Sequence, residues 1–86
     1  MKFILLNHIK IQAKERGIDI KIIEEAISNP GQIVPGEKGL KAAQKKFLDK
    51  GRNKECLIRV IFREEEGTRT GITAYITSKV RKYWRA

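Results

Sequence analysis

The chain is 86 residues long, which is enough for one small domain and too short for a barrel or a doubly wound sheet. Its 19 Lys and Arg outnumber its 10 Asp and Glu, the formal charge is +9, and the 41% of hydrophobic residues predict a folded core rather than disorder. The single cysteine, Cys56, excludes an intrachain disulfide and a cysteine zinc site, and the lack of any long apolar run predicts a cytoplasmic protein that does not contact a membrane.

The N-terminal residues predict a short helix. The Asn7 side chain is suited to cap a helix over about residues 8–16. Gly17 is suited to end that helix, because glycine readily adopts the left-handed backbone of a helix C-terminus. The apolar stripe of this helix is expected to consist of Ile4, Ile11 and Ala13.

A second helix is predicted directly after the first. Asp19 is its candidate N-cap, and the helix runs over residues 20–28. Ile20, Ile23 and Ile27 recur at the spacing i, i+3, i+7 and form one apolar face. Glu24 and Glu25 are expected to face water. The sequence Asn29-Pro30-Gly31 ends the helix.

The remaining residues predict mainly strands. Residues 32–34 form a short extended piece, and residues 40–48 are ambiguous because their Lys, Ala and Gln favour helix. Residues 56–62 are rich in β-branched side chains and predict a strand. Residues 70–77 predict a second strand, which forms a hairpin with the first across the charged turn at residues 64–67. The tail that follows is basic and aromatic.

Several short motifs occur in a defined order along the chain. They are His8, Arg16-Gly17-Ile18, Ser28-Asn29-Pro30-Gly31, Ala43-Gln44-Lys45-Lys46-Phe47, the run from Leu57 to Phe62, Ile72-Thr73-Ala74-Tyr75 and the run from Val80 to Trp84. In this order they resemble a family of small prokaryotic domains of unknown function. That family is similar to the superfamily of compact ribonuclease toxins that includes barnase, the tRNA-cutting colicins and RelE-type toxins.

The resemblance implies an α+β fold in a single domain spanning the whole chain. Two N-terminal helices would pack on one face of a three- to four-stranded antiparallel sheet. Residues 40–48 would then be a strand, against their local propensity. The other face of the sheet would be open and basic.

Strand periodicity places a set of polar residues on that open face. Side chains alternate between the two faces of a strand, so Thr73 and Tyr75 share a face opposite Ile72, Ala74 and Ile76. Arg59 and Arg63 likewise share a face opposite Ile58, Val60 and Phe62. Arg59, Thr73 and Tyr75 therefore converge on the open face. Lys45 and Lys46 point to opposite faces, so only one of them joins this set.

These residue types suit cleavage of RNA without a metal or cofactor. The reaction needs a base, a cation that stabilises the phosphorane, and an acid. His8 is the only histidine, and an imidazole side chain can serve as base or acid. Arg59 can hold a phosphate through two hydrogen bonds. Tyr75 can stack on a base or bind a phosphate, and the resemblance adds Thr73 to this catalytic set.

Each of these residues also has a plain structural alternative. His8 can cap or pack a helix, and Arg59 can pair with the acidic residues 64–66. Thr73 and Tyr75 are ordinary strand residues. Cys56 is most simply a small buried side chain. Tyr83 and Trp84 are either a C-terminal anchor or a stacking platform.

The charge is concentrated in the second part of the chain. Residues 1–31 hold five Lys and Arg against four Asp and Glu, whereas residues 32–86 hold fourteen against six. Such a field attracts polyanions, nucleic acid first. The candidate RNA-binding residues are Lys45, Lys46, Arg63, Arg81 and Lys82.

The sequence and the resemblance together predict an endoribonuclease toxin of a toxin–antitoxin pair. Its substrate would be RNA, and an acidic antitoxin would cover the basic face. The alternative is a non-catalytic module on the same fold that binds nucleic acid or another protein. Asp19, Asp49 and the acidic residues 64–66 do not suggest a metal-binding cluster.

Overall fold

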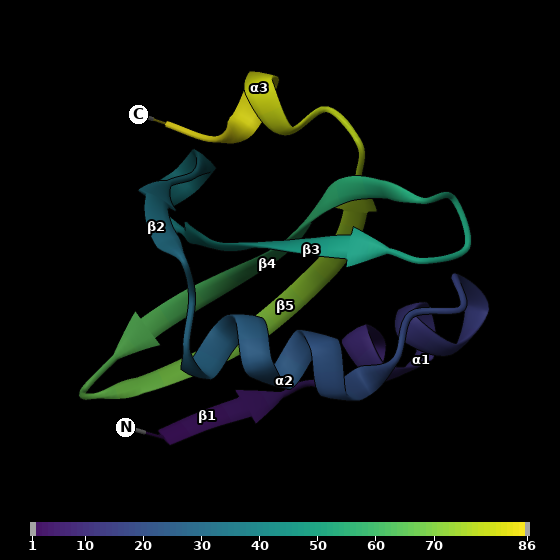
Figure 1. Cartoon of the computed structure of the whole chain (residues 1–86). Coiled ribbons are helices and arrows are strands. Elements are labelled where there is room, and N and C mark those ends of the chain that lie inside the picture. The colour runs from purple at the N-terminus through teal and green to yellow at the C-terminus, as the bar shows by residue number, and fades with distance from the viewer. Residues whose placement is uncertain (1, 86) are drawn as a thin grey trace.

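Within residues 2–85, which this computed structural model describes, five strands form one sheet in the order β1-β5-β4-β3-β2 (Figure 1). The elements are β1 (Lys2–Leu5), α1 (Asn7–Glu15), α2 (Ile20–Ser28), β2 (Gln32–Pro35), the 3₁₀ turn η1 (Glu37–Gly39), β3 (Lys41–Asp49), β4 (Lys54–Glu65), β5 (Thr68–Thr77) and α3 (Val80–Tyr83). Neighbouring strands are antiparallel except for β1, which pairs parallel to β5. The mixed α+β class is therefore as predicted.

The prediction of three to four antiparallel strands below two N-terminal helices is only partly correct. Residues 2–5 form β1, a parallel edge strand, and α3 follows the last strand. An apolar run of four residues does not reveal its own secondary structure, because it is too short for periodicity. Its partner Thr68–Gly71 lies more than sixty residues away in the sequence. The pairing of β1 with β5 thus depends on tertiary structure, and local sequence patterns do not predict it.

Helix α1 begins close to the predicted position but with a different apolar face. Leu6 is its N-cap residue, no side chain caps it, and Asn7 is already helical. Ile9 and Ala13 are its buried residues, whereas Ile4 in β1 is 53% exposed and Ile11 is 58% exposed. The predicted stripe was therefore wrong except at Ala13. Ile9 and Ala13 are four residues apart and share one face, while Ile11 points to the opposite side.

Helix α2 matches the prediction closely. The Asp19 side chain accepts a hydrogen bond from the backbone N–H of Lys21 at 2.9 Å, so the predicted N-cap is confirmed. Ile23 and Ile27 are fully buried, and Ile20 packs against the core at its margin. Glu25 is exposed as expected, but Glu24 is half-buried.

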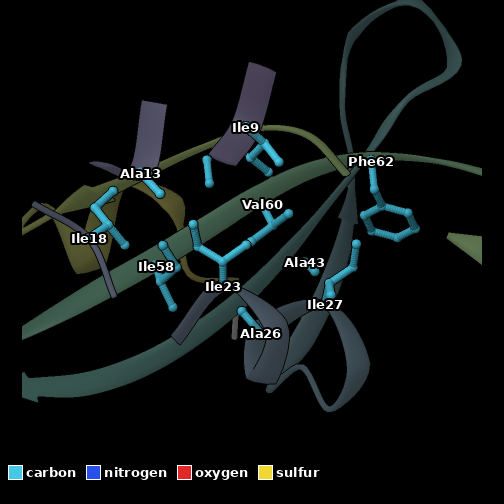
Figure 2. Close-up of a cluster of buried hydrophobic side chains, with 11 residues drawn as sticks. Ile9, Ala13, Ile18, Ile23, Ala26, Ile27, Ala43, Ile58, Val60 and Phe62 are labelled. Carbon is cyan, nitrogen blue, oxygen red and sulfur yellow. The ribbon is translucent and has the colours of Figure 1, made fainter. Parts of the chain in front are cut away.

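The main core lies between the helices and one face of the sheet (Figure 2). Helices α1 and α2 supply apolar side chains that meet Ile58, Val60 and Phe62 of β4 and Ala74 of β5. Every second residue of these strands faces the helices, as the alternation predicts. Cys56 is fully buried, in agreement with its expected role as a small apolar side chain.

Residues 40–48, ambiguous by propensity, are mostly strand. Strand β3 begins at Lys41 and lies between β2 and β4, so that both of its edges are hydrogen-bonded. Ala42 and Ala43 are both fully buried, on opposite faces. The strand that the resemblance implied is confirmed. Two neighbouring strands outweigh the modest helix preference of Lys, Ala and Gln.

The hairpin between β4 and β5 turns within two residues. Glu66 and Gly67 both have positive φ angles, 49° and 79°, which is the backbone of a type I′ turn. The predicted four-residue turn is therefore shorter, because Glu64 and Glu65 belong to β4. A bulge follows in β5: Ile61 pairs with Thr73 and Phe62 with Gly71, so Ile72 is the extra residue.

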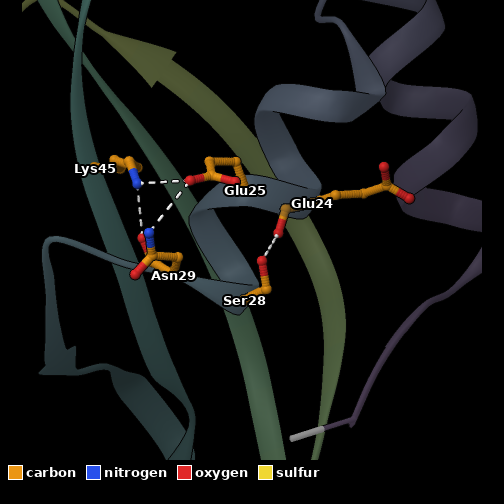
Figure 3. Close-up of polar contacts among 5 residues, drawn as sticks. All are labelled: Glu24, Glu25, Ser28, Asn29 and Lys45. Atoms are coloured by element: carbon orange, nitrogen blue, oxygen red, sulfur yellow. Dashed lines mark hydrogen bonds and ion pairs between the residues drawn. The ribbon is translucent and has the colours of Figure 1, made fainter.

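Lys45 faces the helices and binds the end of α2 (Figure 3). Its ammonium lies 3.0 Å from the Glu25 carboxylate and donates to the Asn29 carbonyl at 2.9 Å. The hydrogen bond from Lys45 lowers the pKa of Glu25 below its ordinary value, and the Asn29 amide adds to this effect. The ionised carboxylate thus favours the folded state.

We expect Glu25→Gln to weaken the acid sensitivity of the fold. A carboxylate whose pKa is lower in the folded protein contributes stability at pH values above its unfolded pKa, about 4.3. That contribution disappears as the pH falls through the lower, folded pKa. Melting temperatures are measured between about pH 7 and pH 3. Wild type should melt at a higher temperature than Glu25→Gln at neutral pH, and the two proteins should melt at the same temperature in acid. A constant difference at every pH would contradict this role.

Candidate functional site

The sheet face opposite α1 and α2 carries the predicted polar residues. We call it the polar face and define it by Gln44, Lys46, Arg59, Thr73 and Tyr75, which alternate with core residues along β3, β4 and β5. Arg59 and Tyr75 are direct cross-strand partners. The Arg59 Nη1 donates to the Tyr75 hydroxyl, and the guanidinium carbon lies 5.6 Å from the centre of the Tyr75 ring. The predicted convergence of these two residues is therefore observed.

Gln44 occupies the other side of Arg59 and was not singled out as a site residue from the sequence. It pairs across the strands with Arg59, is fully buried, and accepts a hydrogen bond from Arg59 Nε at 2.6 Å. Arg59 is thus held by Gln44 and Tyr75 and does not pair with the acidic residues 64–66. The signal was the motif Ala43-Gln44-Lys45-Lys46-Phe47, which carries part of the resemblance, but composition alone does not separate Gln44 from a surface residue.

The C-terminal residues cover part of the polar face, which is less open than predicted. The ring of Tyr83 lies 4.3 Å from the Arg59 guanidinium carbon and meets the Tyr75 ring edge-on at 6.3 Å. The Lys46 ammonium lies 4.4 Å from the centre of the Trp84 ring. Both aromatic side chains are half-buried. Of the two predicted roles for Tyr83 and Trp84, the geometry is that of an anchor for the end of the chain.

A groove remains open beside Arg59. Its volume is about 660 Å³, and it runs between the polar face and the loop that contains η1. The lining residues are Pro35, Gly36, Glu37, Lys38, Leu40, Arg59, Ile61 and Tyr75. The groove therefore combines a guanidinium, an ammonium and one carboxylate, that of Glu37, with apolar and aromatic walls. Such a surface can accept a phosphate and a planar ring at adjacent positions.

His8 lies at the rim of this face rather than beside Arg59. It is exposed on α1, and its Nε2 lies 3.0 Å from the Gln12 amide nitrogen. The Gln12 oxygen in turn accepts a hydrogen bond from the Thr73 hydroxyl at 2.7 Å. Thr73 lies two residues from Tyr75 on the same face. His8 is thus linked to the polar face through Gln12 and Thr73.

The position of α1 explains this link. Strand β1 pairs only with residues 68–71 of β5, so the rest of that edge of β5 is free for another partner. Helix α1 lies along it, and Arg16 Nη1 donates to the carbonyl of Ala74 at 2.7 Å. Gln12 precedes Arg16 by four residues and therefore occupies the same side of the helix. The predicted helix with His8 near its start is confirmed, but its approach to the site depends on the edge of the sheet.

The predicted RNA-binding residues fall into separate places. Lys46 lies on the polar face, whereas Lys45 faces the helices, which settles the alternative that the sequence left open. Lys46, Arg81 and Lys82 share a cavity of about 730 Å³ with Glu55, Ser78, Lys79, Val80 and Trp84. Arg63 is exposed near the far end of β4, with its Nε 3.7 Å from Glu65. The structure thus groups three of the five residues.

No cluster of three or more His, Cys, Asp or Glu side chains is positioned to hold a metal ion within residues 2–85. In the same part of the chain, no helix is both long and apolar enough to cross a membrane. Comparison of the chain with protein-family models, curated proteins and solved structures gave no match.

Proposed function

We propose that this protein is a toxin-type endoribonuclease. It cleaves RNA without a metal ion, at a site on the polar face that contains Arg59. The observation that supports the proposal is the Arg59 guanidinium, held between Gln44 and Tyr75 beside a groove of about 660 Å³. Nη2 of Arg59 makes no hydrogen bond to residues 2–85. A phosphate in the groove can take that donor.

The proposed reaction uses the 2′-hydroxyl of the RNA as nucleophile. A base removes its proton, the oxygen attacks phosphorus, and the bond from phosphorus to the 5′-oxygen breaks as an acid protonates the leaving oxygen. Arg59 stabilises the negative charge of the phosphorane. His8 is the only imidazole in the chain, so it serves as either base or acid and a two-histidine mechanism is excluded. Tyr75 and Thr73 bind the phosphate or orient the neighbouring groups.

Charge supports the choice of partners. The formal charge is +9, and the cavity that contains Lys46, Arg81 and Lys82 offers further cations beside Trp84. A single strand of RNA that enters the groove can extend toward these residues. The same field favours an acidic antitoxin as the protein partner in the cytoplasm.

We expect RNA binding to weaken steeply with salt. If the protein neutralises about five phosphates of a single strand, log K falls with log[salt] with a slope of about −3.5. Fluorescence anisotropy of a labelled single-stranded RNA across a salt series measures this slope. Lys82→Gln, which removes one exposed cation, should make the slope shallower by slightly less than one. A slope near zero would contradict the proposal that the protein binds nucleic acid.

A non-catalytic binding module is the second candidate, and one observation favours it. Two of the nitrogen atoms of Arg59 already donate to protein groups, and His8 is held by Gln12 rather than directed at Arg59. Such a guanidinium can bind a phosphate without cleaving it. Incubation of a labelled RNA with the protein in EDTA separates the two functions. Tight binding with no cleavage of any RNA tested would favour the module.

A further inference from the structure

The amide of Gln44 is fixed in one orientation by groups on two sides. Its oxygen accepts from Arg59 Nε at 2.6 Å, and its nitrogen donates to the Gln32 oxygen at 2.8 Å and to the Tyr83 carbonyl at 3.1 Å. Rotation of the amide by half a turn would place N–H groups against the Arg59 donor and the oxygen against two acceptors. Gln44 is fully buried, so water cannot replace these partners. The orientation that suits Arg59 therefore requires Gln32 and Tyr83.

The same network docks the end of the chain, residues 79–85, which we call the C-terminal segment. The Gln32 side chain binds the backbone of Arg85 twice, accepting from its N–H at 2.9 Å and donating to its carbonyl at 2.8 Å. Trp84 lies so close to Gly31 that a Cβ at that position would come within 2.8 Å of its ring. Figure 1 shows the chain passing from α3 toward β2. Docking of this segment thus completes the hydrogen bonds of Gln44.

We propose that Gln44 is a positioning residue that aligns the Arg59 guanidinium and couples its alignment to docking of the C-terminal segment. Undocking removes the Tyr83 carbonyl from Gln44 and the Tyr83 ring from Arg59. Because coupling free energies are reciprocal, loss of the Gln44 contacts also loosens the segment. The consequence for cleavage rests on the proposed function, but the coupling is a property of the free protein.

Three variants separate the two ends of the network. Gln32→Ala removes only contacts to the segment and to Gln44, and it leaves Arg59 untouched. Gln44→Met keeps the size of the side chain and loses every hydrogen bond of that side chain. Gln44→Glu keeps an oxygen for Arg59 and loses both donors, so it repels the Gln32 oxygen and the Tyr83 carbonyl. Ile33→Thr is the matched control, since Ile33 is the neighbour of Gln32 in β2 and points to the other face.

Two measurements read the coupling without any RNA. Trp84 is the only tryptophan, so quenching of its fluorescence by neutral acrylamide reports docking of the segment. The Nε–H resonance of Arg59, assigned by its loss in Arg59→Lys, reports the hydrogen bond to Gln44. We expect Gln32→Ala and Gln44→Met to expose Trp84 and to move the Arg59 resonance toward that of a solvated arginine. In Gln44→Glu, Trp84 should be exposed while the Arg59 resonance stays protected, and Ile33→Thr should change neither.

Cleavage of RNA supplies a third measurement. We expect Gln32→Ala, distant from the reacting atoms, to lower the cleavage rate about fivefold, the effect of one hydrogen bond. The double variant Gln32→Ala/Gln44→Met should be no slower than Gln44→Met, because both changes act through one network. An Arg59 resonance unchanged in Gln32→Ala, or Trp84 equally buried in all variants, would overturn the coupling. If the first two measurements behave as expected and wild type cleaves no RNA, the proposed function fails and the coupling stands.

Discussion

Replacement of Arg59 by alanine should lower the rate of RNA cleavage by about 100- to 1000-fold, equivalent to about 2.7–4 kcal/mol of transition-state stabilisation. The guanidinium is held on the polar face by Gln44 and Tyr75, and it borders the groove together with Tyr75. Arg59→Lys should recover only part of the rate, because an ammonium keeps the charge but not the paired donors. Cleavage of a labelled RNA in EDTA measures the rates, and circular dichroism confirms that each variant is folded.

Arg63→Ala is the matched control for this experiment. Arg63 shares the strand and the face of Arg59, but it is exposed, pairs with Glu65 and lines neither the Arg59 groove nor the cavity with Lys46, Arg81 and Lys82. A contribution of Arg63 to RNA binding is removed by measuring at saturating RNA, where its loss should change the rate by less than about threefold. His8→Ala should lower the rate by at least about tenfold, because the variant lacks the proposed base or acid. Full activity in both Arg59→Ala and His8→Ala would exclude this site.

Ile23→Asp should unfold the domain at room temperature. Ile23 is fully buried in the contact between α2 and the sheet, and Figure 2 shows it between Ile58 and Val60. The substitution places a carboxylate in an apolar environment without a partner and removes a buried side chain. The expected cost is at least about 3 kcal/mol, a large part of the stability of a small domain. Thermal and urea unfolding followed by circular dichroism measure it.

Lys21→Asp introduces the same side chain on the exposed side of the same helix and is the control. Lys21 is exposed in the first turn, where a negative charge interacts favourably with the helix dipole. Its free energy of unfolding should stay within about 0.5 kcal/mol of wild type, as should that of Glu24→Ala. If Ile23→Asp melts at the same temperature as these variants, the assigned core face of α2 is incorrect.

The sequence was sufficient to predict those elements whose signals are local. Helix α2 has its cap at Asp19 and its apolar spacing within eleven residues, and β4 and β5 carry alternating or continuous apolar runs that need no distant partner. The alternation of side chains along each strand was also sufficient to predict that Arg59, Thr73 and Tyr75 share one face. Each of these features depends on the geometry of a single helix or strand, which is the range in which sequence patterns are informative.

Tertiary structure decided the features that depend on distant partners. β1 is a strand because the edge of β5 is available for pairing. This pairing also sets the rotation of α1 about its own axis, so that Ile9 is buried in place of Ile11. Lys46 rather than Lys45 joins the polar face because β3 takes its register from β2 and β4. Gln44 became part of the site only when residues 32, 59 and 83 met around it. A buried polar group needs partners from wherever the fold brings them, and those partners are far apart in the chain.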